Sequence, residues 1–148
     1  MTQIAIHLVV TDPDQAAIWY AEALGARETN RITLPGGRTL TVDLLLGDTA
    51  LAVAGEMPEM GMRSPAALGA TSAAFHLTVP DVDTAWARAL KAGATVFEPL
   101  HDAFWGERTG QLLDPFGHRW ALDQHIQDIP HDEIVARAAE LFSGSATA

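Results

Sequence analysis

The chain has 148 residues, 48% of them hydrophobic and 19% charged, and 9 basic against 19 acidic side chains give a formal net charge of −10. This length and composition are typical of one globular domain with an apolar core of its own. The acidic balance disfavours nucleic acid and anionic membrane surfaces as partners, because both repel a negatively charged protein. The absence of cysteine excludes disulfides, thiolate metal sites and a cysteine nucleophile.

The N-terminal segment has no basic region ahead of an apolar stretch, so it does not resemble a signal peptide. The most apolar segment, residues 40–53, is interrupted by Asp43 and Asp48 and is too short to span a bilayer. We therefore expect a cytoplasmic protein that does not associate with a membrane.

The first half of the chain predicts a strand, a helix and three further strands. Residues 4–10 alternate in the manner of a strand, and Asp12 or Asp14 then caps a helix that ends at Gly25. Extended segments 27–34, 38–46 and 49–54 follow, and the turn residues between them are typical of hairpins.

The second half repeats this order. The segment His7-Leu8-Val9-Val10-Thr11-Asp12 recurs as His76-Leu77-Thr78-Val79-Pro80-Asp81, and a second helix, capped by Asp81 or Asp83, ends at Gly93. Extended segments 95–98, 107–113 and 118–124 follow, the last two joined by Asp114-Pro115-Phe116-Gly117. The sequence therefore predicts a single domain over residues 1–148, built from two βαβββ modules (residues 3–54 and 72–125), a linker (55–71) and a C-terminal amphipathic helix (130–142).

Alternation within the strands separates two faces of each predicted sheet. The larger apolar side chains point one way, and smaller or more polar ones point the other way. The second set includes His7, Asp43, His76 and Asp123. We expect each sheet to be covered by a helix on its apolar face and to curve around a cavity on the other.

The βαβββ duplication resembles the vicinal oxygen chelate (VOC) superfamily of glyoxalase I, extradiol dioxygenases and bleomycin-resistance proteins, and most closely its PhnB-like branch. The residues that carry the resemblance are Asp12, Trp19-Tyr20, Gly25-Ala26, Val79-Pro80-Asp81-Val82-Asp83, Ala92-Gly93-Ala94, Trp105-Gly106-Glu107-Arg108 and Asp114-Pro115-Phe116-Gly117-His118-Arg119-Trp120. The resemblance implies an α+β fold in which two curved mixed sheets surround a shared cavity between the first and last strands of the modules. It also implies a homodimer.

Metal-dependent members of this superfamily place a ligand on the first and last strand of each module. Counted residue by residue, these positions fall on Ala5, Ala74, Ala121 and the aliphatic residues 51–53. None of these side chains can coordinate a metal, so we expect no metal ion. No Gly-rich phosphate loop or dinucleotide fingerprint is present either, so no cofactor is predicted.

The leading functional hypothesis is a metal-independent binding protein that sequesters a cationic or aromatic small molecule. The predicted ligand-binding residues are His7, Asp43, His76, Trp105, Arg108 and Asp123. Asp43 offers a carboxylate to a cation, Trp105 a stacking surface and Arg108 a planar donor fork. Two of them also have a structural interpretation, Asp43 as a solvated strand residue and Trp105 as a plug that holds a loop on the barrel.

The alternative is a lyase, isomerase or dioxygenase. His7, His76 and Asp123 lie two residues beyond the family's ligand positions and could form a register-shifted site for Fe(II), Zn²⁺ or Ni²⁺. A metal-free enzyme would instead use Asp43 or a histidine as an acid–base pair. A third possibility is an accessory protein with a collapsed cavity.

Overall fold

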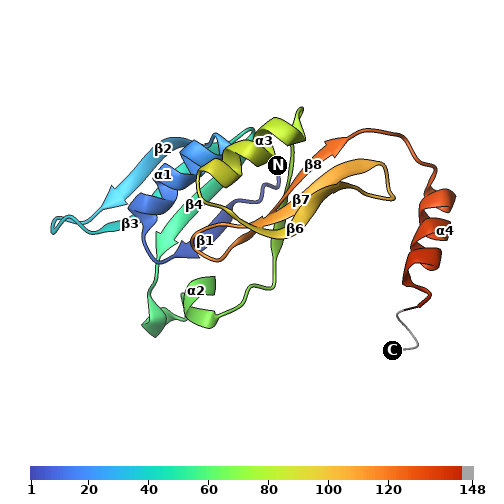
Figure 1. Ribbon diagram of the computed structural model, residues 1–148. Helices are drawn as coiled ribbons and strands as arrows, with labels where there is room; N and C mark the ends of the chain where they lie inside the picture. The colour runs from blue at the N-terminus through green and yellow to red at the C-terminus, as the bar shows by residue number, and fades with distance from the viewer. Residues whose placement is uncertain (145–148) are drawn as a thin grey trace.

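The computed structural model describes residues 1–144 and contains two βαβββ modules (Figure 1). The first module comprises β1 (Ile6–Val10), α1 (Pro13–Leu24), β2 (Arg27–Thr33), β3 (Thr39–Leu46) and β4 (Thr49–Gly55). Its strands form one mixed sheet in the order β1-β4-β3-β2, in which β1 runs parallel to β4 and the other pairs are antiparallel.

The second module repeats this topology. It comprises β5 (Ala74–Thr78), α3 (Val82–Lys91), β6 (Thr95–Asp102), β7 (Glu107–Leu113) and β8 (Arg119–His125), in the sheet order β5-β8-β7-β6. The linker holds the 3₁₀ turn η1 (Pro58–Met60) and the short helix α2 (Pro65–Leu68), and α4 (His131–Phe142) follows the second sheet. The predicted α+β class with two mixed sheets and a C-terminal helix is confirmed.

Two elements differ from the sequence prediction. Strand β6 continues to Asp102, four residues beyond the expected end, although it contains Pro99. A proline is tolerated there because β6 is an edge strand, and the register shifts between Glu98 and His101. The linker also forms α2, whose Ser64 side chain accepts a hydrogen bond from the amide of Ala67.

The helix caps resolve the two alternatives left by the sequence. Asp12 caps α1, since its carboxylate accepts from the amides of Asp14 and Gln15 at 3.1 Å each. Asp81 caps α3 in the same way through the amide of Thr84. The repeated aspartate at the end of the first strand of each module therefore starts the helix that covers the sheet.

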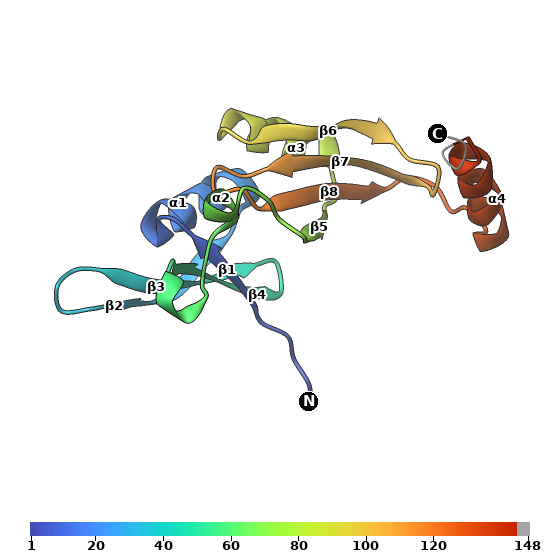
Figure 2. The same cartoon turned by 90° about the horizontal axis from the view of Figure 1, so that it is seen from below.

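The modules pack through their helices and a shared apolar core. Figure 2 shows the two sheets as separate bodies, with α1 on the side of the first sheet that faces the second module. Helix α1 contacts α3, and the larger core cluster combines β1, α1, β3 and β4 with Phe116 and Trp120 of the second module. Trp19 and Trp120 are both buried, as expected for core residues.

A buried carboxylate joins the modules. Asp114 accepts hydrogen bonds from the Tyr20 hydroxyl, from Trp120 Nε1 at 3.0 Å, and from the amides of Phe116 and His118 at 2.8 and 3.0 Å. His118 Nε2 lies 2.8 Å from the carbonyl oxygen of Val9 in β1. The Asp-Pro-Phe-Gly-His motif is therefore a structural junction between the second module and α1 and β1 of the first.

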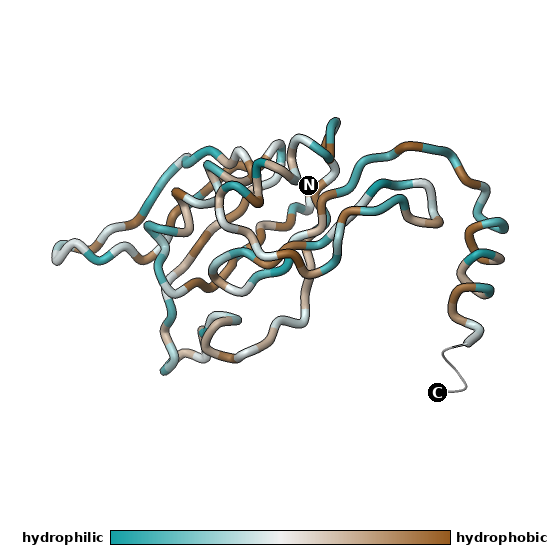
Figure 3. The backbone as a smooth tube through the Cα atoms, in the orientation of Figure 1, coloured by the Kyte–Doolittle hydropathy of each residue, from teal (hydrophilic) through white to brown (hydrophobic). Residues whose placement is uncertain are grey.

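Helix α4 stands apart from both sheets (Figure 1). None of its residues is fully buried, and Val135 and Leu141 are more than half exposed. Figure 3 shows hydrophobic and hydrophilic bands alternating along it. Arg137 Nη1 links the helix to the β6–β7 turn by donating to the carbonyl of Phe104 at 3.1 Å. No helix among residues 1–144 is long and apolar enough to cross a membrane.

Candidate functional site

The face of each sheet that points away from the helices is called its inner face below. In the first module, the inner face brings together His7 and Asp43, two of the predicted site residues. Both lie beside Ala52, because β1 pairs His7 with Ala52 and β3 pairs Asp43 with Ala52. Two strand spacings separate their Cα atoms by roughly 9–10 Å.

The small side chain of Ala52 leaves a hollow between them. A cavity of about 320 Å³ is lined there by Ala5, His7, Thr29, Asp43, Leu44, Leu45, Ala50, Leu51 and Ala52. The His7 ring and the Asp43 carboxylate make no hydrogen bond or ion pair with any residue that the structure describes; Thr29 bonds only the backbone oxygen of Asp43. Both groups are free to contact a ligand.

The inner face of the second module pairs two other predicted residues. His76 Nδ1 lies 2.7 Å from Asp123 Oδ2, and Thr109 donates its hydroxyl to Asp123 Oδ1. The Asp123 side chain is only 7% exposed, whereas that of His76 is 54% exposed. A carboxylate can only accept, so His76 donates through Nδ1, and Nε2 is the ring nitrogen left for a ligand.

A second cavity, of about 260 Å³, lies between the two modules at β1, β4, β5 and β8, where the resemblance places the shared cavity. Its walls are mainly apolar: Ile6, Leu46, Thr49, Leu51, Ala74, Phe75, His76, Leu77 and Trp120. Of the predicted site residues only His76 lines it.

The predicted metal site of His7, His76 and Asp123 is not formed within the chain. Among residues 1–144, no group of three or more His, Cys, Asp or Glu side chains could hold a metal ion. The physical reason is that His7 belongs to the inner face of the first sheet and the other two to that of the second. The modules meet through α1, α3 and the β7–β8 turn, which keeps these faces apart.

Trp105 and Arg108 lie outside both groups. Trp105 sits in the β6–β7 turn against Phe104, with ring centroids 4.9 Å apart, and its Nε1 bonds Glu107. Arg108 pairs with Asp83 of α3 and Asp102 of β6, at 3.2 and 3.0 Å. Its guanidinium is therefore held on the side of β7 that α3 covers, away from the inner face.

Three inner-face residues of the second module were not predicted from the sequence. They are Thr109, Gln111 and Arg119, which register beside Asp123, Ala121 and Leu113. The Gln111 Oε1 and Arg119 Nε atoms are buried without a hydrogen-bond partner. Alternation along β8 could have identified Arg119, since residues 119, 121 and 123 share one face.

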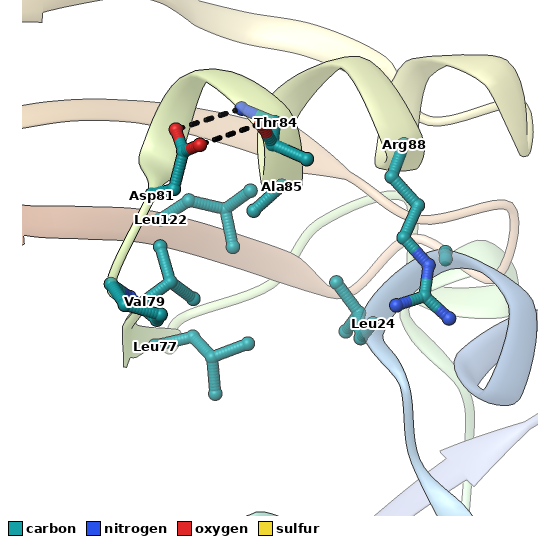
Figure 4. Close-up of a pocket in the computed structure, with 10 residues that line it drawn as sticks. Leu24, Leu77, Val79, Asp81, Thr84, Ala85, Arg88 and Leu122 are labelled. Atoms are coloured by element: carbon teal, nitrogen blue, oxygen red, sulfur yellow. Dashed lines mark hydrogen bonds between the residues drawn. The ribbon is translucent and has the colours of Figure 1, made fainter.

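The cleft between α1 and α3 offers few unbonded polar groups to a ligand. Figure 4 shows Leu24, Leu77, Val79 and Leu122 around a cavity of about 260 Å³. Its arginine, Arg88, donates to the carbonyls of Glu22 and Ala21 at the end of α1. Its polar side chains are thus engaged within the protein, and what remains is an apolar surface.

Comparison with known proteins agrees with this architecture. The family model of the Glyoxalase/Bleomycin resistance protein/Dioxygenase superfamily matches residues 2–122. The chain belongs to this superfamily. An uncharacterized Mycobacterium bovis protein is 41% identical over 141 residues, which cover 93% of both chains. A Mycobacterium tuberculosis protein is equally similar over 93% of this chain and 83% of its own length.

Solved structures share the fold. TioX from Micromonospora sp. ML1 is 30% identical, with a TM-score of 0.68 over 85% of this chain and 100% of its own. The fosfomycin resistance protein FosX from Listeria monocytogenes is 14% identical, with a TM-score of 0.65 over 90% of this chain and 98% of its own. At that identity, FosX shows the fold alone.

Proposed function

We propose that this protein is a cytoplasmic, metal-independent binding protein of the PhnB-like branch that sequesters a cationic or aromatic small molecule. The observation that carries the proposal is the His7–Asp43 cavity, where an imidazole and a carboxylate, both without partners, flank the alanine floor. A concave site with a mainly apolar floor and a few polar groups is typical of small-molecule binding. The Asp43 carboxylate and the net charge of −10 favour a cation.

Aliphatic side chains at the family's ligand positions support metal independence. The registers place Ala52 beside His7 and Ala121 beside His76, so the two last-strand positions are equivalent. Alanine occupies both, and Ala5 and Ala74 occupy the two first-strand positions. A ligand at either inner face would contact methyl groups where a metal-dependent relative has its metal.

We further propose a homodimer. The whole of β2 is exposed, the inner faces are open, and α4 holds an apolar stripe away from its own chain. An exposed edge strand and an exposed apolar helix face are each typical of an interface. Light scattering during size exclusion should give twice the chain mass, and truncation after residue 130 should give a monomer. A full-length monomer would contradict this proposal.

Thermal unfolding with aromatic amines tests the binding site. Benzylamine and larger aromatic amines should raise the melting temperature more than the matched neutral alcohols, with or without a metal chelator, because binding to the folded state stabilises it. The Asp43→Asn variant should lose this stabilisation, and Asp48→Asn, in the exposed β3–β4 turn, should keep it. The site would be contradicted if aromatic amines stabilised both variants equally, or if they did not stabilise the wild type.

A second candidate function is metal-free proton transfer at His76. The observation that favours it is the His76–Asp123–Thr109 chain, in which a buried carboxylate with both oxygens bonded fixes the imidazole and leaves Nε2 as the acceptor. His76 would be the base, and Asp123 a positioning residue.

A nitrobenzisoxazole is a suitable probe of this base. Nε2 would remove the ring C–H proton, the C–H electron pair would form the nitrile, and the N–O bond would break to release a phenolate. The rate should exceed that of free imidazole and disappear in His76→Gln, while His7→Gln retains it. A wild-type rate no greater than free imidazole would exclude this function.

A further inference from the structure

The inner face of the second module holds another pocket at the start of β8. Its volume is about 360 Å³, and it is lined by Phe97, Leu113, Gly117 and Arg119 of the module and by Pro65, Gly69, Ala70 and Thr71 of the linker. The size falls within the range of small-molecule sites. None of the residues predicted from the sequence lines this pocket.

In this pocket Arg119 packs against an aromatic ring and forms no ion pair with a described acidic side chain. Its guanidinium carbon lies 5.0 Å from the centroid of Phe97, and its buried Nε has no hydrogen-bond partner. It forms no ion pair with any residue that the structure describes, whereas Arg31 and Arg108 each contact two carboxylates. In a chain with 19 acidic and 9 basic side chains, a cation left unpaired inside a pocket points to an anionic ligand.

We propose that this pocket binds the carboxylate of an aromatic acid. A planar guanidinium matches a carboxylate through two parallel hydrogen bonds, and no ion pair with a described residue competes for the Arg119 charge. Phe97 is 54% exposed and offers its ring to a second ring, and Leu113 adds an apolar wall. The site thus recognises a flat anion with an apolar body.

Gln111 lies near the pocket but does not line it. Leu113 registers with Arg119, and Gln111 registers with Ala121, so Gln111 and Arg119 are diagonal neighbours on one face. Their Cα atoms are therefore roughly 7–8 Å apart. The buried Gln111 Oε1 also lacks a partner and can only accept a hydrogen bond. Because Gln111 does not line the pocket, its buried carbonyl sets no requirement on the ligand.

This inference extends the proposed binding function to a second pocket of opposite charge, and calorimetric titration with para-hydroxybenzoate tests it. The acid should bind at least about tenfold more tightly than para-hydroxybenzamide, which has the same shape without the charge. Arg119→Gln should weaken binding of the acid by about tenfold or more, and Arg119→Lys should recover only part of it, because an ammonium lacks the planar fork. Arg27→Gln, which removes the same charge from an exposed position of β2, should bind like the wild type.

Several results would overturn the site. They are no binding of the acid, equal binding of acid and amide, or unchanged affinity in Arg119→Gln. Phe97→Leu keeps the arginine and should weaken binding of the aromatic acid more than binding of acetate. It therefore tests the pocket even if the Arg119 variants do not fold. Asp43→Asn should leave acid binding intact. Loss of amine binding with retained acid binding, or the reverse, therefore separates failure of the proposed function from failure of this site.

Discussion

The two modules share a strand order and a first-strand histidine, yet only the second module holds its histidine in place. Next to His7 the inner face of β4 continues with Ala54, which registers with Thr41. Next to His76 the inner face of β8 continues with Asp123, which registers with Thr109. One residue, alanine or aspartate, therefore decides whether the imidazole is free to meet a ligand or fixed with a defined proton.

The turn between the last two strands is also more strongly bonded in the second module than in the first. In the first module Gly47-Asp48 is a short exposed hairpin. In the second module the longer turn buries Asp114 and bonds it to Tyr20 of the other module. The first module therefore supplies an open cavity and free side chains, while the second supplies the buried polar bonds that hold the chain together.

The largest expected effect is that of Asp114→Ala, which tests the asymmetry of the turns. The substitution leaves the Tyr20 hydroxyl, the Trp120 indole and two amides without their acceptor. The free energy of unfolding should fall by about 3–5 kcal/mol, as is typical for the loss of one member of a buried charged network. Urea unfolding measures this. Asp48→Ala should change it by less than about 0.5 kcal/mol, and similar losses in the two variants would show that the turns are equivalent.

The next effect is that of Tyr20→Phe. Burial, and then the charge of Asp114, raise the pKa of Tyr20 well above its ordinary value. The folded state thus favours the protonated hydroxyl, so its contribution is fully present below the unfolded pKa of about 10 and is lost as pH rises through the folded pKa. The variant should lose about 1–3 kcal/mol at neutral pH and show a flatter decline in alkali.

The chain has one tyrosine, so tyrosinate absorbance reports Tyr20 alone. This absorbance should appear together with unfolding when pH is raised. Titration of Tyr20 at its ordinary pKa in the folded protein would mean that the junction is not buried.

The sequence could predict the elements because their signals are local. Period-2 alternation, the repeated Asp12 and Asp81 caps and the glycine stops each act within a few residues. Helix α2 had a local signal too, with Ser64 as the cap and Gly69 after its end, but a helix of four residues lacks the periodicity that the analysis relied on. The full length of β6 depends on its place at the sheet edge, which only the assembled sheet defines.

For the candidate site, local signals again predicted the face on which a residue lies, but not the residues that it meets. Alternation placed His7, Asp43, His76 and Asp123 on inner faces, where His76 contacts Asp123 and Ala52 separates His7 from Asp43. The sequence does not show how two neighbouring strands register, so Thr109 could not be matched to Asp123. Nor does it show that Arg108 would meet Asp83 on the side that α3 covers. Register and helix packing are tertiary properties, and they decide which polar side chains meet.

A smaller effect is expected for Asp123→Asn, which tests whether the fixed histidine depends on the aspartate. Nitrogen-15 NMR should show His76 protonated on Nδ1 in the wild type. His7 has no such partner among the described residues. It should show the usual mixture of the two tautomers, in which the Nε2-protonated form is the main one. The variant should lose this difference and about 1–2 kcal/mol of stability, because a carboxylate is a stronger acceptor for Thr109 and His76 than an amide. If the His76 tautomer is unchanged in this variant, β5 alone, and not Asp123, fixes the His76 ring.

The smallest effect, and the sharpest test of the comparison, is that of Ala54→Asp. Ala54 occupies the place in the first module that Asp123 occupies in the second, with Thr41 beside it and His7 one step away on the neighbouring strand. The new carboxylate should accept from both side chains, so His7 should move to the Nδ1-protonated form. The bonds gained should largely offset the cost of burying the charge, and stability should change by only about 1 kcal/mol. If His7 keeps its tautomer, the difference between the modules lies in strand geometry and not in this one residue.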